Sequence, residues 1–558
     1  MVNIAILDGY VDEPAIFGVP PFISPYPRYI AGAIVKAGYK ADYYTIDQWR
    51  NKKILMKKYD YLIAIGGAIV PGKYLRSSPA SIKELQKIAN EFYGTKILAG
   101  PVSGFSYNFK EAHELKKHYD YFAIGDPDAW IYDFFTNVNP VRRERTNEEW
   151  KEFPLLGANI VNMHPDYPIP LIAEIEMYKG CIRYASGGCL FCSEVLYGKP
   201  RTREIEDIQK EINALYKNGI VNFRLGGATC IFTYMAEEIS LKEGNFKPNP
   251  NALSQLFKGI WKQSPGIKVL HTDNANPNVI ASYPTESEKI IEILVDYTTP
   301  GNVLSFGLES ADPVVKEKNN LNATPEEVLF AISLVNKHGK HIGTNGMPKL
   351  LPGINFIGGL EGETDESYSL NKKFLEEIID RDLIVRRVNI RQVAPVRHKF
   401  KKLNKKRFFE FKDYVRGYFD SMMLQRMLPI GNVVKEVFIE LNIGEEAYGR
   451  QIGTYPLLIK FPYKIKPSCF VNAKIFAHGS RSVHGIDTEF NLNQAPYSII
   501  KRLPAINNKI AISIIRNRPF NDIKEISKII NDNNAVAFLS NYTTINETSW
   551  KDKIVVNM

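Results

Sequence analysis

The first 135 residues alternate between short apolar runs and longer segments whose apolar positions recur at helical spacing. The apolar runs have the length of buried strands, and the periodic segments between them indicate amphipathic helices. We predict strands at 3–8, 59–67, 95–101 and 119–126, and helices at 28–41 and 81–92. This alternation predicts a doubly wound parallel sheet, which binds ligands at the carboxyl edge of its strands. The glycines that follow these strands either lie at a ligand-binding site or only form tight turns. They are Gly66, Gly67, Gly100 and Gly125.

A second alternating run begins after a charged, proline-containing stretch at 136–168. Strands are predicted at 171–181, 221–227, 268–274, 302–310, 352–359 and 385–395, and helices at 205–219, 325–339 and 365–380. About six strand–helix units of this kind predict a full or partial β/α barrel. The catalytic residues of such barrels come from the loops at the carboxyl ends of the strands.

Three of the chain's five cysteines lie in GCIRYASGGCLFC (180–192), directly after the first strand of this second run. The other two, Cys230 and Cys469, are isolated, and a buried inert thiol is the expected role of Cys230. A disulfide fits poorly because three is an odd number and cysteine is sparse. Structural zinc needs a fourth ligand, and His164 and His271 stand at no familiar spacing. The remaining alternative is a [4Fe–4S] cluster with three protein thiolates, which leaves one iron open for chemistry.

The segments around these thiols occur in an order that resembles the radical SAM superfamily over residues 168–400. LGGAT (225–229) stands in place of the family's GGE motif, GLES (307–310) in place of its fourth-strand pattern, and GGLEGETDESY (358–368) in place of the segment after its fifth strand. The family holds a [4Fe–4S] cluster through three cysteines and uses it to cleave S-adenosylmethionine (SAM). The resemblance therefore implies both cofactors.

The resemblance also implies roles for individual residues, with two departures from the family pattern. It implies that Cys181, Cys189 and Cys192 hold the cluster and that Gly226, Gly227 and Glu309 contact SAM. Ala228 replaces the family's Glu, so only the backbone of the two glycines carries over. The first cysteine gap is seven residues where the family has three, and no pattern in the sequence explains the difference.

The N-terminal domain of comparable family members binds a second iron–sulfur cluster or cobalamin. Residues 1–180 contain no cysteine, which excludes a second cluster bound in this way. The D-x-H-x-x-G loop often seen in cobalamin domains is also missing, since the chain reads LDGYVDEP after its first predicted strand. Cobalamin and a substrate-docking role therefore both stay open for this domain.

Basic and aromatic residues interleave in RHKFKKLNKKRFFEFK (397–412). Such a pattern suits RNA binding, and it equally suits an ordinary solvated helix. Short β runs follow at 432–486 and predict a small antiparallel barrel. They resemble the TRAM domain, an RNA-binding barrel, and the candidates for RNA contact are Tyr448, Arg450 and Arg481.

The sequence LPAINNKIA (503–511) resembles the core of a helix–hairpin–helix module, with Ala505 and Asn507 at the positions of its two hairpin glycines. These substitutions leave a protein-contact or structural role open beside phosphate binding.

The organisation that we expect is a Rossmann-like domain (1–140), a linker (141–168), a radical SAM core (169–400), a basic linker (401–431), a TRAM-like barrel (432–486), a helix–hairpin–helix (487–535) and a tail (536–558).

The net charge of +10 and the pI near 9.0 favour an anionic partner. No signal-peptide pattern and no stretch of roughly 18 apolar residues is present, so we expect a cytoplasmic protein with no membrane partner. Together with the two RNA-type modules, the charge predicts methylation or a related carbon functionalisation of a tRNA nucleoside, with an electron donor such as ferredoxin or flavodoxin. The alternatives are radical modification of a protein residue, chemistry on a small metabolite, and a nucleic-acid-binding protein with a structural cluster.

Overall fold

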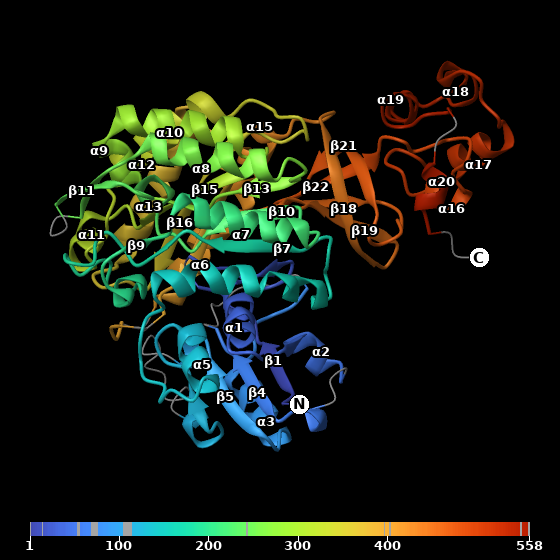
Figure 1. The fold of residues 1–558 in the computed structure, drawn as a ribbon. Coiled ribbons are helices and arrows are strands. Elements are labelled where there is room, and N and C mark those ends of the chain that lie inside the picture. Colours follow the sequence, from blue (N-terminus) through green and yellow to red (C-terminus); the bar gives the residue numbers. More distant parts are fainter. Residues whose placement is uncertain are drawn as a thin grey trace. The chain divides into compact units, whose positions relative to one another are not determined.

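The computed structural model describes the chain except residues 1, 14, 53–55, 68–75, 104–113, 241–243, 395–396, 401–402, 547–548 and 556–558. Its internal contacts divide the chain into two units, Met1–Gly339 with Leu350–Phe409, and Lys340–Lys349 with Glu410–Met558. The first unit is mostly blue to yellow in Figure 1, and the second is mostly orange to red.

A five-stranded parallel sheet forms the N-terminal part of the first unit, in the order β3-β1-β4-β5-β6. Its strands are β1 (Ile4–Asp8), β3 (Ala41–Thr45), β4 (Tyr61–Ile65), β5 (Thr95–Ala99) and β6 (Tyr121–Phe122). The helices of this part are α1 (Pro25–Lys36), α2 (Ile46–Arg50), α3 (Ile82–Glu91) and α5 (Pro127–Phe135). β1 is buried along its whole length between two parallel neighbours, and its residues are apolar up to the buried Asp8 at its carboxyl end. The doubly wound fold predicted from the sequence is confirmed.

A second set of parallel strands forms the barrel part of this unit. The strands are β2 (Phe22–Ile23), β7 (Ile172–Glu176), β10 (Asn222–Gly226), β13 (Val269–His271), β14 (Asn274–Ala275), β15 (Asn302–Glu309), β16 (Leu350–Gly358) and β17 (Arg387–Gln392). Pairing runs β2-β7-β10-β13 and β14-β15-β16-β17, and the chain joins the two sets through residues 269–275. The free side of β7 is taken by β2 rather than by β17, so the barrel is partial.

Helices alternate with these strands and cover them (Figure 1). They are α7 (Ile205–Lys217), α8 (Pro250–Gln263), α9 (Pro277–Ser282), α10 (Pro284–Tyr297), α11 (Pro313–Lys318), α12 (Pro325–Gly339) and α13 (Asp365–Asp380). Apolar positions spaced along α7 bury one face of that helix, which is the pattern expected for an amphipathic helix on a sheet. The fold class predicted for this region is therefore confirmed.

The stretch expected to be a linker between the two parts is ordered. It contains helix α6 (Asn147–Leu156), which begins with a capping box in which Thr146 and Glu149 satisfy each other's backbone N–H groups. Trp150 and Phe153 of α6 pack into a buried cluster with residues of α1. The charged residues that suggested a linker lie among these apolar positions, so one face of the segment packs while the other is solvated.

Buried ion pairs connect the N-terminal helix α1 to the barrel. Arg28 is fully buried, and its guanidinium donates to the carboxylate of Glu211 on α7 and to the backbone carbonyl of Glu174 on β7. Arg203 binds the same Glu211 carboxylate, whose pKa these two arginines hold below its ordinary value against the effect of burial. Burial of several charges is tolerable here because each has a hydrogen-bonded partner.

The second unit contains a closed five-stranded barrel with the order β18-β19-β20-β22-β21. The strands are β18 (Val433–Ile443), β19 (Glu446–Gln451), β20 (Leu458–Phe461), β21 (Phe470–His478) and β22 (Ser482–Asp487). The small β-barrel expected from the sequence is thus present. Two of the candidate RNA contacts already have acidic partners, since Tyr448 Oη donates to Glu446 at 2.6 Å and Arg450 Nε donates to Glu440 at 2.7 Å.

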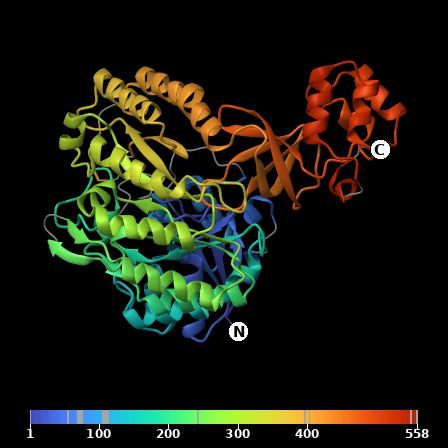
Figure 2. The ribbon, with the colours of Figure 1, turned by 90° about the horizontal axis from the view of Figure 1, so that it is seen from above.

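Short helices follow the barrel in the chain and lie together as a red group in Figure 2. They are α16 (Tyr497–Ile500), α17 (Asn508–Arg516), α18 (Ile526–Ile529), α19 (Asn533–Tyr542) and α20 (Trp550–Lys553). Ala505 has a φ of 62°, so it occupies the left-handed region that a hairpin glycine would adopt. Asn507 instead caps α17 because its side chain accepts a hydrogen bond from the Ile510 N–H.

Helices α14 (Lys405–Tyr414) and α15 (Asp420–Met427) occupy most of the expected basic linker. In the described parts of the chain, no helix has the length and apolarity needed to cross a membrane.

The ion pairs on α1 provide a test of what holds the N-terminal sheet to the barrel. Arg28→Ala leaves the buried Glu211 with one cation fewer, and loss of one partner of a buried pair typically costs about 3–5 kcal/mol. Lys36→Ala on the same helix removes an exposed pair with Glu152, which solvent screens, and should leave the stability nearly unchanged. We expect the first urea-unfolding transition to move strongly only for the Arg28 variant. Equal shifts in both variants would contradict this account.

Candidate active site

The thiol loop, residues 180–192, follows β8 (Tyr178–Lys179) at the carboxyl side of β7. Its seven-residue gap folds as consecutive turns, in which the Tyr184 N–H donates to the Cys181 carbonyl at 2.9 Å and the Gly187 N–H to the Tyr184 carbonyl at 3.2 Å. Gly187 and Gly188 then adopt φ values of 80° and 58°, which favour glycine. The additional residues therefore double back on themselves, which explains how a wide gap in sequence keeps the cysteines together.

All three thiols are close enough to influence one another's protonation. The pKa of Cys189 is raised to about 11, mainly by burial, with smaller contributions from Glu309 and from the neighbouring Cys181. The pKa of Cys192 lies well above its ordinary value for the same reasons, with both other thiols contributing. The cysteines are all free, so none is lost to a disulfide. Thiols in such surroundings become thiolates when a metal ion replaces their protons.

Mononuclear zinc does not suit this arrangement. With Zn–S bonds of 2.3 Å, tetrahedral ligand atoms lie roughly 3.8 Å apart. Among the described residues, the only three potential ligands that lie within 4.8 Å of one another are Glu288, Glu292 and His338. The thiols are therefore spaced more widely than zinc requires. His164 and His271 are both buried elsewhere, and burial lowers the pKa of each to about 4.

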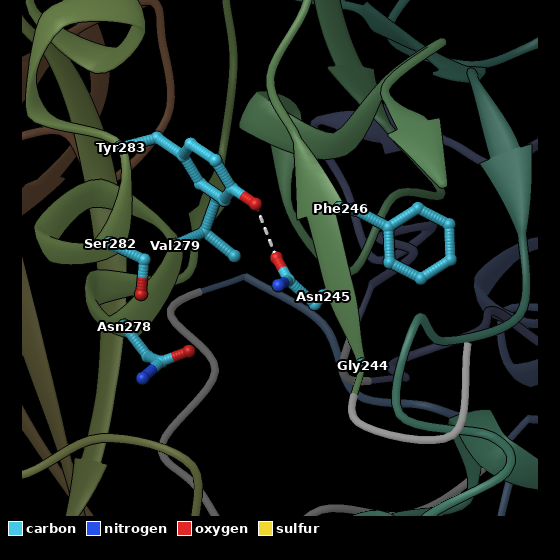
Figure 3. Close-up of a pocket in the computed structure, with 7 residues that line it drawn as sticks. All are labelled: Gly244, Asn245, Phe246, Asn278, Val279, Ser282 and Tyr283. Carbon is cyan, nitrogen blue, oxygen red and sulfur yellow. Dashed lines mark hydrogen bonds between the residues drawn. The ribbon is translucent and has the colours of Figure 1, made fainter. Parts of the chain in front are cut away.

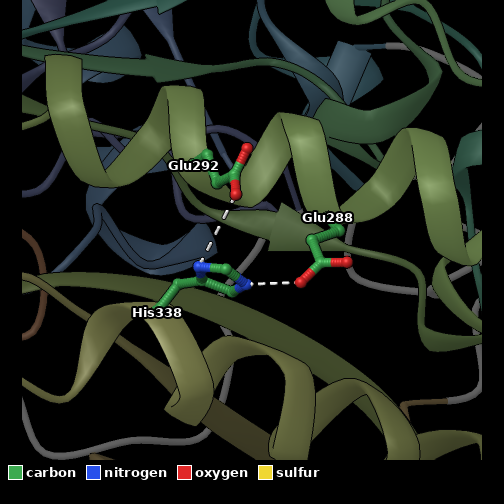
Figure 4. Close-up of side chains that lie close together, drawn as sticks. All are labelled: Glu288, Glu292 and His338. Atoms are coloured by element: carbon green, nitrogen blue, oxygen red, sulfur yellow. Dashed lines mark hydrogen bonds and ion pairs between the residues drawn. The ribbon is translucent and has the colours of Figure 1, made fainter.

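The group formed by Glu288, Glu292 and His338 joins α10 to α12 (Figure 4). His338 Nε2 lies 2.7 Å from Glu288 Oε1, and His338 Nδ1 lies 3.9 Å from Glu292 Oε1. Lys337 Nζ also lies 2.6 Å from Glu288 Oε1, so a cation already shares this carboxylate. We interpret the group as an ion-pair network between two helices.

Glu309, the predicted SAM contact on β15, has the features of a ligand-binding carboxylate. Its φ is 65°, at a point where the pairing of β15 with β16 shifts register. A non-glycine residue in this region is strained, and such strain often accompanies function. Within the described chain, its Oε2 is buried without a hydrogen-bond partner. Burial raises the pKa of Glu309 to about 8, which Arg391 only partly opposes.

The unpartnered Glu309 carboxylate fits the ammonium group of SAM. Burial of an unpaired carboxylate carries a large cost in free energy, and a bound cation would offset that cost. Glu309 also raises the pKa of Cys189, so the carboxylate and the thiol loop share one electrostatic environment. The residues present therefore suit both the cluster and SAM.

Gly226 and Gly227 end β10 in a closely packed place. A side chain at Gly226 would overlap the Glu174 carboxylate, and a Cβ at Gly227 would lie 2.8 Å from Glu176 Cα. The Gly227 N–H donates to the carbonyl of Ala15 at 2.8 Å, and the Gly226 carbonyl accepts from Met177 N–H. Packing alone thus requires both glycines, and their contact with SAM stays a prediction.

The loop after β1 reaches from the N-terminal sheet to the barrel. Besides the bond from Ala15 to Gly227, Phe17 lies 4.1 Å from the guanidinium carbon of Arg224 on β10. At the other end of the loop, a Cβ on Gly67 would lie 2.6 Å from Val11 Cα. Val11 thus packs against the carboxyl end of β4, at the edge of the sheet where ligands normally bind. Residues 68–75 and 104–113, which follow β4 and β5 in the chain, lie outside the described residues, so cobalamin binding by this domain stays a prediction.

A cavity of about 340 Å³ lies between β12 (Asn245–Lys247) and α9, at the carboxyl side of the strands (Figure 3). Tyr283 Oη donates to Asn245 Oδ1 across this cavity. Its lining is uncharged: Gly244, Asn245, Phe246, Asn278, Val279, Ser282 and Tyr283. A Cβ on Gly244 would lie 3.3 Å from Arg183 Cγ, so the cavity adjoins the thiol loop. No sequence pattern had pointed to this cavity, because its walls come from two segments that are distant in the sequence.

Comparison with known proteins agrees with these features. A model described as the radical SAM superfamily matches residues 175–369. An uncharacterised protein of Methanocaldococcus jannaschii is 43% identical over 86% of this chain and 92% of its own length. A tRNA-2-methylthio-N(6)-dimethylallyladenosine synthase of Ehrlichia ruminantium is 26% identical over 37% of this chain and 40% of its own. A ribosomal protein uS12 methylthiotransferase of Clostridioides difficile is 24% identical over the same share of each chain.

One solved structure has a similar arrangement over much of the chain. It is the radical S-adenosylmethionine methyltransferase TsrM from Kitasatospora setae with cobalamin and a [4Fe-4S] cluster bound, and it covers 70% of this chain and 75% of its own. The identity is 12% and the TM-score is 0.45.

The thiol assignments can be tested by metal content. Serine in place of Cys181, Cys189 or Cys192 removes a soft ligand, so each variant should lose most of its iron and sulfide after anaerobic reconstitution. Cys230→Ser is the control, because Cys230 is a buried thiol outside the triad whose sulfur accepts a hydrogen bond from the Asn276 N–H at 3.2 Å. A triad variant that keeps the iron content of the control would not carry a ligand at that position.

Proposed function

Because the chain belongs to the radical SAM superfamily, we propose that Cys181, Cys189 and Cys192 hold its [4Fe–4S] cluster and that the product is a modified RNA nucleoside. The bound cluster supplies the electron that cleaves SAM to a 5′-deoxyadenosyl radical, which can take hydrogen from an unactivated C–H bond. The observation that carries the proposal is the unpartnered buried carboxylate of Glu309 beside the thiol loop. It gives the site a place for a cationic cosubstrate.

The residues around the thiol loop would position the reactants and exclude water. Glu309 would accept hydrogen bonds from the ammonium group of SAM, and the backbone at Gly226 and Gly227 would lie beside it. The adjoining cavity has amide and hydroxyl groups but no charged lining residue. Such a lining suits the neutral, planar edge of a nucleobase, which amides can recognise by hydrogen bonding.

Charge supports RNA as the substrate class. The chain carries ten more positive than negative side chains, and polyanion binding draws on this excess. One similar protein is a tRNA-modifying synthase, and another is a ribosomal protein methylthiotransferase. Modification of a protein residue is therefore the second candidate. An electron donor of the ferredoxin or flavodoxin class completes the proposal. Cobalamin stays a predicted further cofactor of the N-terminal domain.

Glu309→Gln tests the SAM contact. The amide keeps the shape but removes the charge that would pair with the ammonium group, and hydrogen bonds to charged groups contribute about 1.5–3 kcal/mol. We expect SAM to bind roughly 10- to 100-fold more weakly, measured by equilibrium dialysis on reconstituted protein. Glu317→Gln, at an exposed position of α11, should leave binding unchanged. Unchanged binding in the Glu309 variant would exclude this contact.

The substrate class can be tested in cells and in solution. Deletion of the gene should remove one modified nucleoside from total tRNA, and wild-type but not Cys189→Ser protein should restore it. Binding of purified protein to tRNA should weaken steeply as salt rises, because counterions are released on binding. A complete nucleoside profile in the deletion strain would rule out tRNA, and a missing modification on a ribosomal protein would favour the second candidate.

A further inference from the structure

The guanidinium of Arg183 lies within hydrogen-bonding distance of a proposed cluster ligand. Arg183 Nη1 is 3.3 Å from Cys189 Sγ, and the backbone N–H of Arg183 is 3.5 Å from Cys181 Sγ. A single residue therefore donates to two of the three thiols. Arg183 stands in the additional residues of the first cysteine gap, so none of the motifs in the sequence assigns it a role.

Asn320 fixes the position of this guanidinium. Arg183 Nη1 donates to the Asn320 carbonyl at 2.8 Å, and Nη2 donates to the Asn320 side-chain oxygen at 2.7 Å. The Asn320 amide in turn donates to the carbonyls of Ser186 and Gly188 at 3.0 and 2.8 Å. Asn320 has a φ of 49°, a conformation that asparagine tolerates better than most residues. The planar fork of arginine is thus held in one orientation before any ligand binds.

A third side chain, Arg397, also supports the thiol loop and comes from the segment after β17. Arg397 Nη1 lies 3.1–3.3 Å from the carbonyls of Gly187, Cys189 and Cys192. These bonds hold the backbone around the thiols, whereas Arg183 contacts a sulfur directly. Arg183 thus brings a charged side chain to a sulfur ligand, which places it to act on the electronic state of that ligand.

Hydrogen bonds to sulfur ligands and nearby positive charge favour the more negative, reduced state of an iron–sulfur cluster. A charge-assisted bond is also stronger than a neutral one, and its effect is larger where water is excluded. We propose that Arg183 is a positioning residue that holds the Cys189 thiolate and raises the reduction potential of the cluster. This inference rests on the proposed function, because it takes Cys189 as a ligand.

The test uses the full-length protein, reconstituted anaerobically, and an EPR-monitored redox titration. Arg183→Gln should keep its iron content, because all three cysteines remain, and its midpoint potential should move to a more negative value. Arg183→Lys should move it less, since the charge stays but the fork is lost. Lys199→Ala is the matched control for loss of one positive charge, because Lys199 is largely exposed and pairs only with Glu238 in a 3.1 Å ion pair on the surface. A midpoint in Arg183→Gln that equals that of the control would overturn the proposal.

A second measurement separates potential from structure. SAM cleavage by Arg183→Gln should fall when the donor is a flavodoxin and should recover when titanium(III) citrate, a stronger reductant, supplies the electron. Activity that stays equally low with both reductants would mean that Arg183 acts only on the fold of the loop, and the proposal would be wrong. If Arg183→Gln fails to hold iron, the same two measurements on Arg183→Lys decide the matter.

Failure of this inference can be told apart from failure of the proposed function. If Cys189→Ser keeps its iron, Cys189 is not a ligand, and the assignment of the thiol loop itself is wrong. If Cys189→Ser loses its iron while Arg183→Gln has the potential of the control, the cluster assignment stands and only the role of Arg183 is lost.

Discussion

The active site depends on two acidic side chains, Cys189 and Glu309, whose charged forms the protein stabilises only in part. Burial holds the protons of Cys189 and Glu309 on their side chains, with pKa values of about 11 and about 8. In water both groups would lose their protons at lower pH, because hydration stabilises the charged forms. At the carboxyl end of the barrel Arg183 and Arg391 supply only part of this stabilisation, and a ligand has to supply the rest. The site is therefore complementary to groups that bring positive charge, as iron ions and the ammonium group of SAM do.

The same reasoning separates structural carboxylates from functional ones in this fold. Glu211 is as deeply buried as any group in the chain, yet Arg203 and Arg28 hold its pKa below the ordinary value. Its charge belongs to the fold and joins α1 to α7. Glu309 has no such partner among the described residues, apart from the weaker influence of Arg391. The presence of cationic hydrogen-bond partners, rather than burial alone, thus distinguishes a carboxylate that stabilises the fold from one that can bind a ligand.

Local sequence patterns were sufficient for most of the strands and helices of the first unit. The predicted helices at 325–339 and 365–380 coincide with α12 and α13, and Glu309 lies at the end of its predicted strand. Contacts between distant segments could not be predicted in this way. Asn320 accepts a hydrogen bond from Arg183 although the two residues are 137 positions apart in the sequence, and no pattern near either residue predicts this contact. The helix α6 was missed for a similar reason, because its apolar face is explained only by the α1 surface on which it packs.

The distribution of charge also bears on which substrate class suits the chain. The chain carries an excess of ten positive side chains, whereas the cavity beside the thiol loop has an uncharged lining. A small anionic metabolite would have to carry its charge into this uncharged cavity, at a cost in desolvation. An RNA strand can leave its phosphates at the basic surface and present only a neutral base to the interior. The uncharged cavity beside Arg183 matches the second situation, because its amides and hydroxyls can satisfy a base edge but cannot neutralise a phosphate.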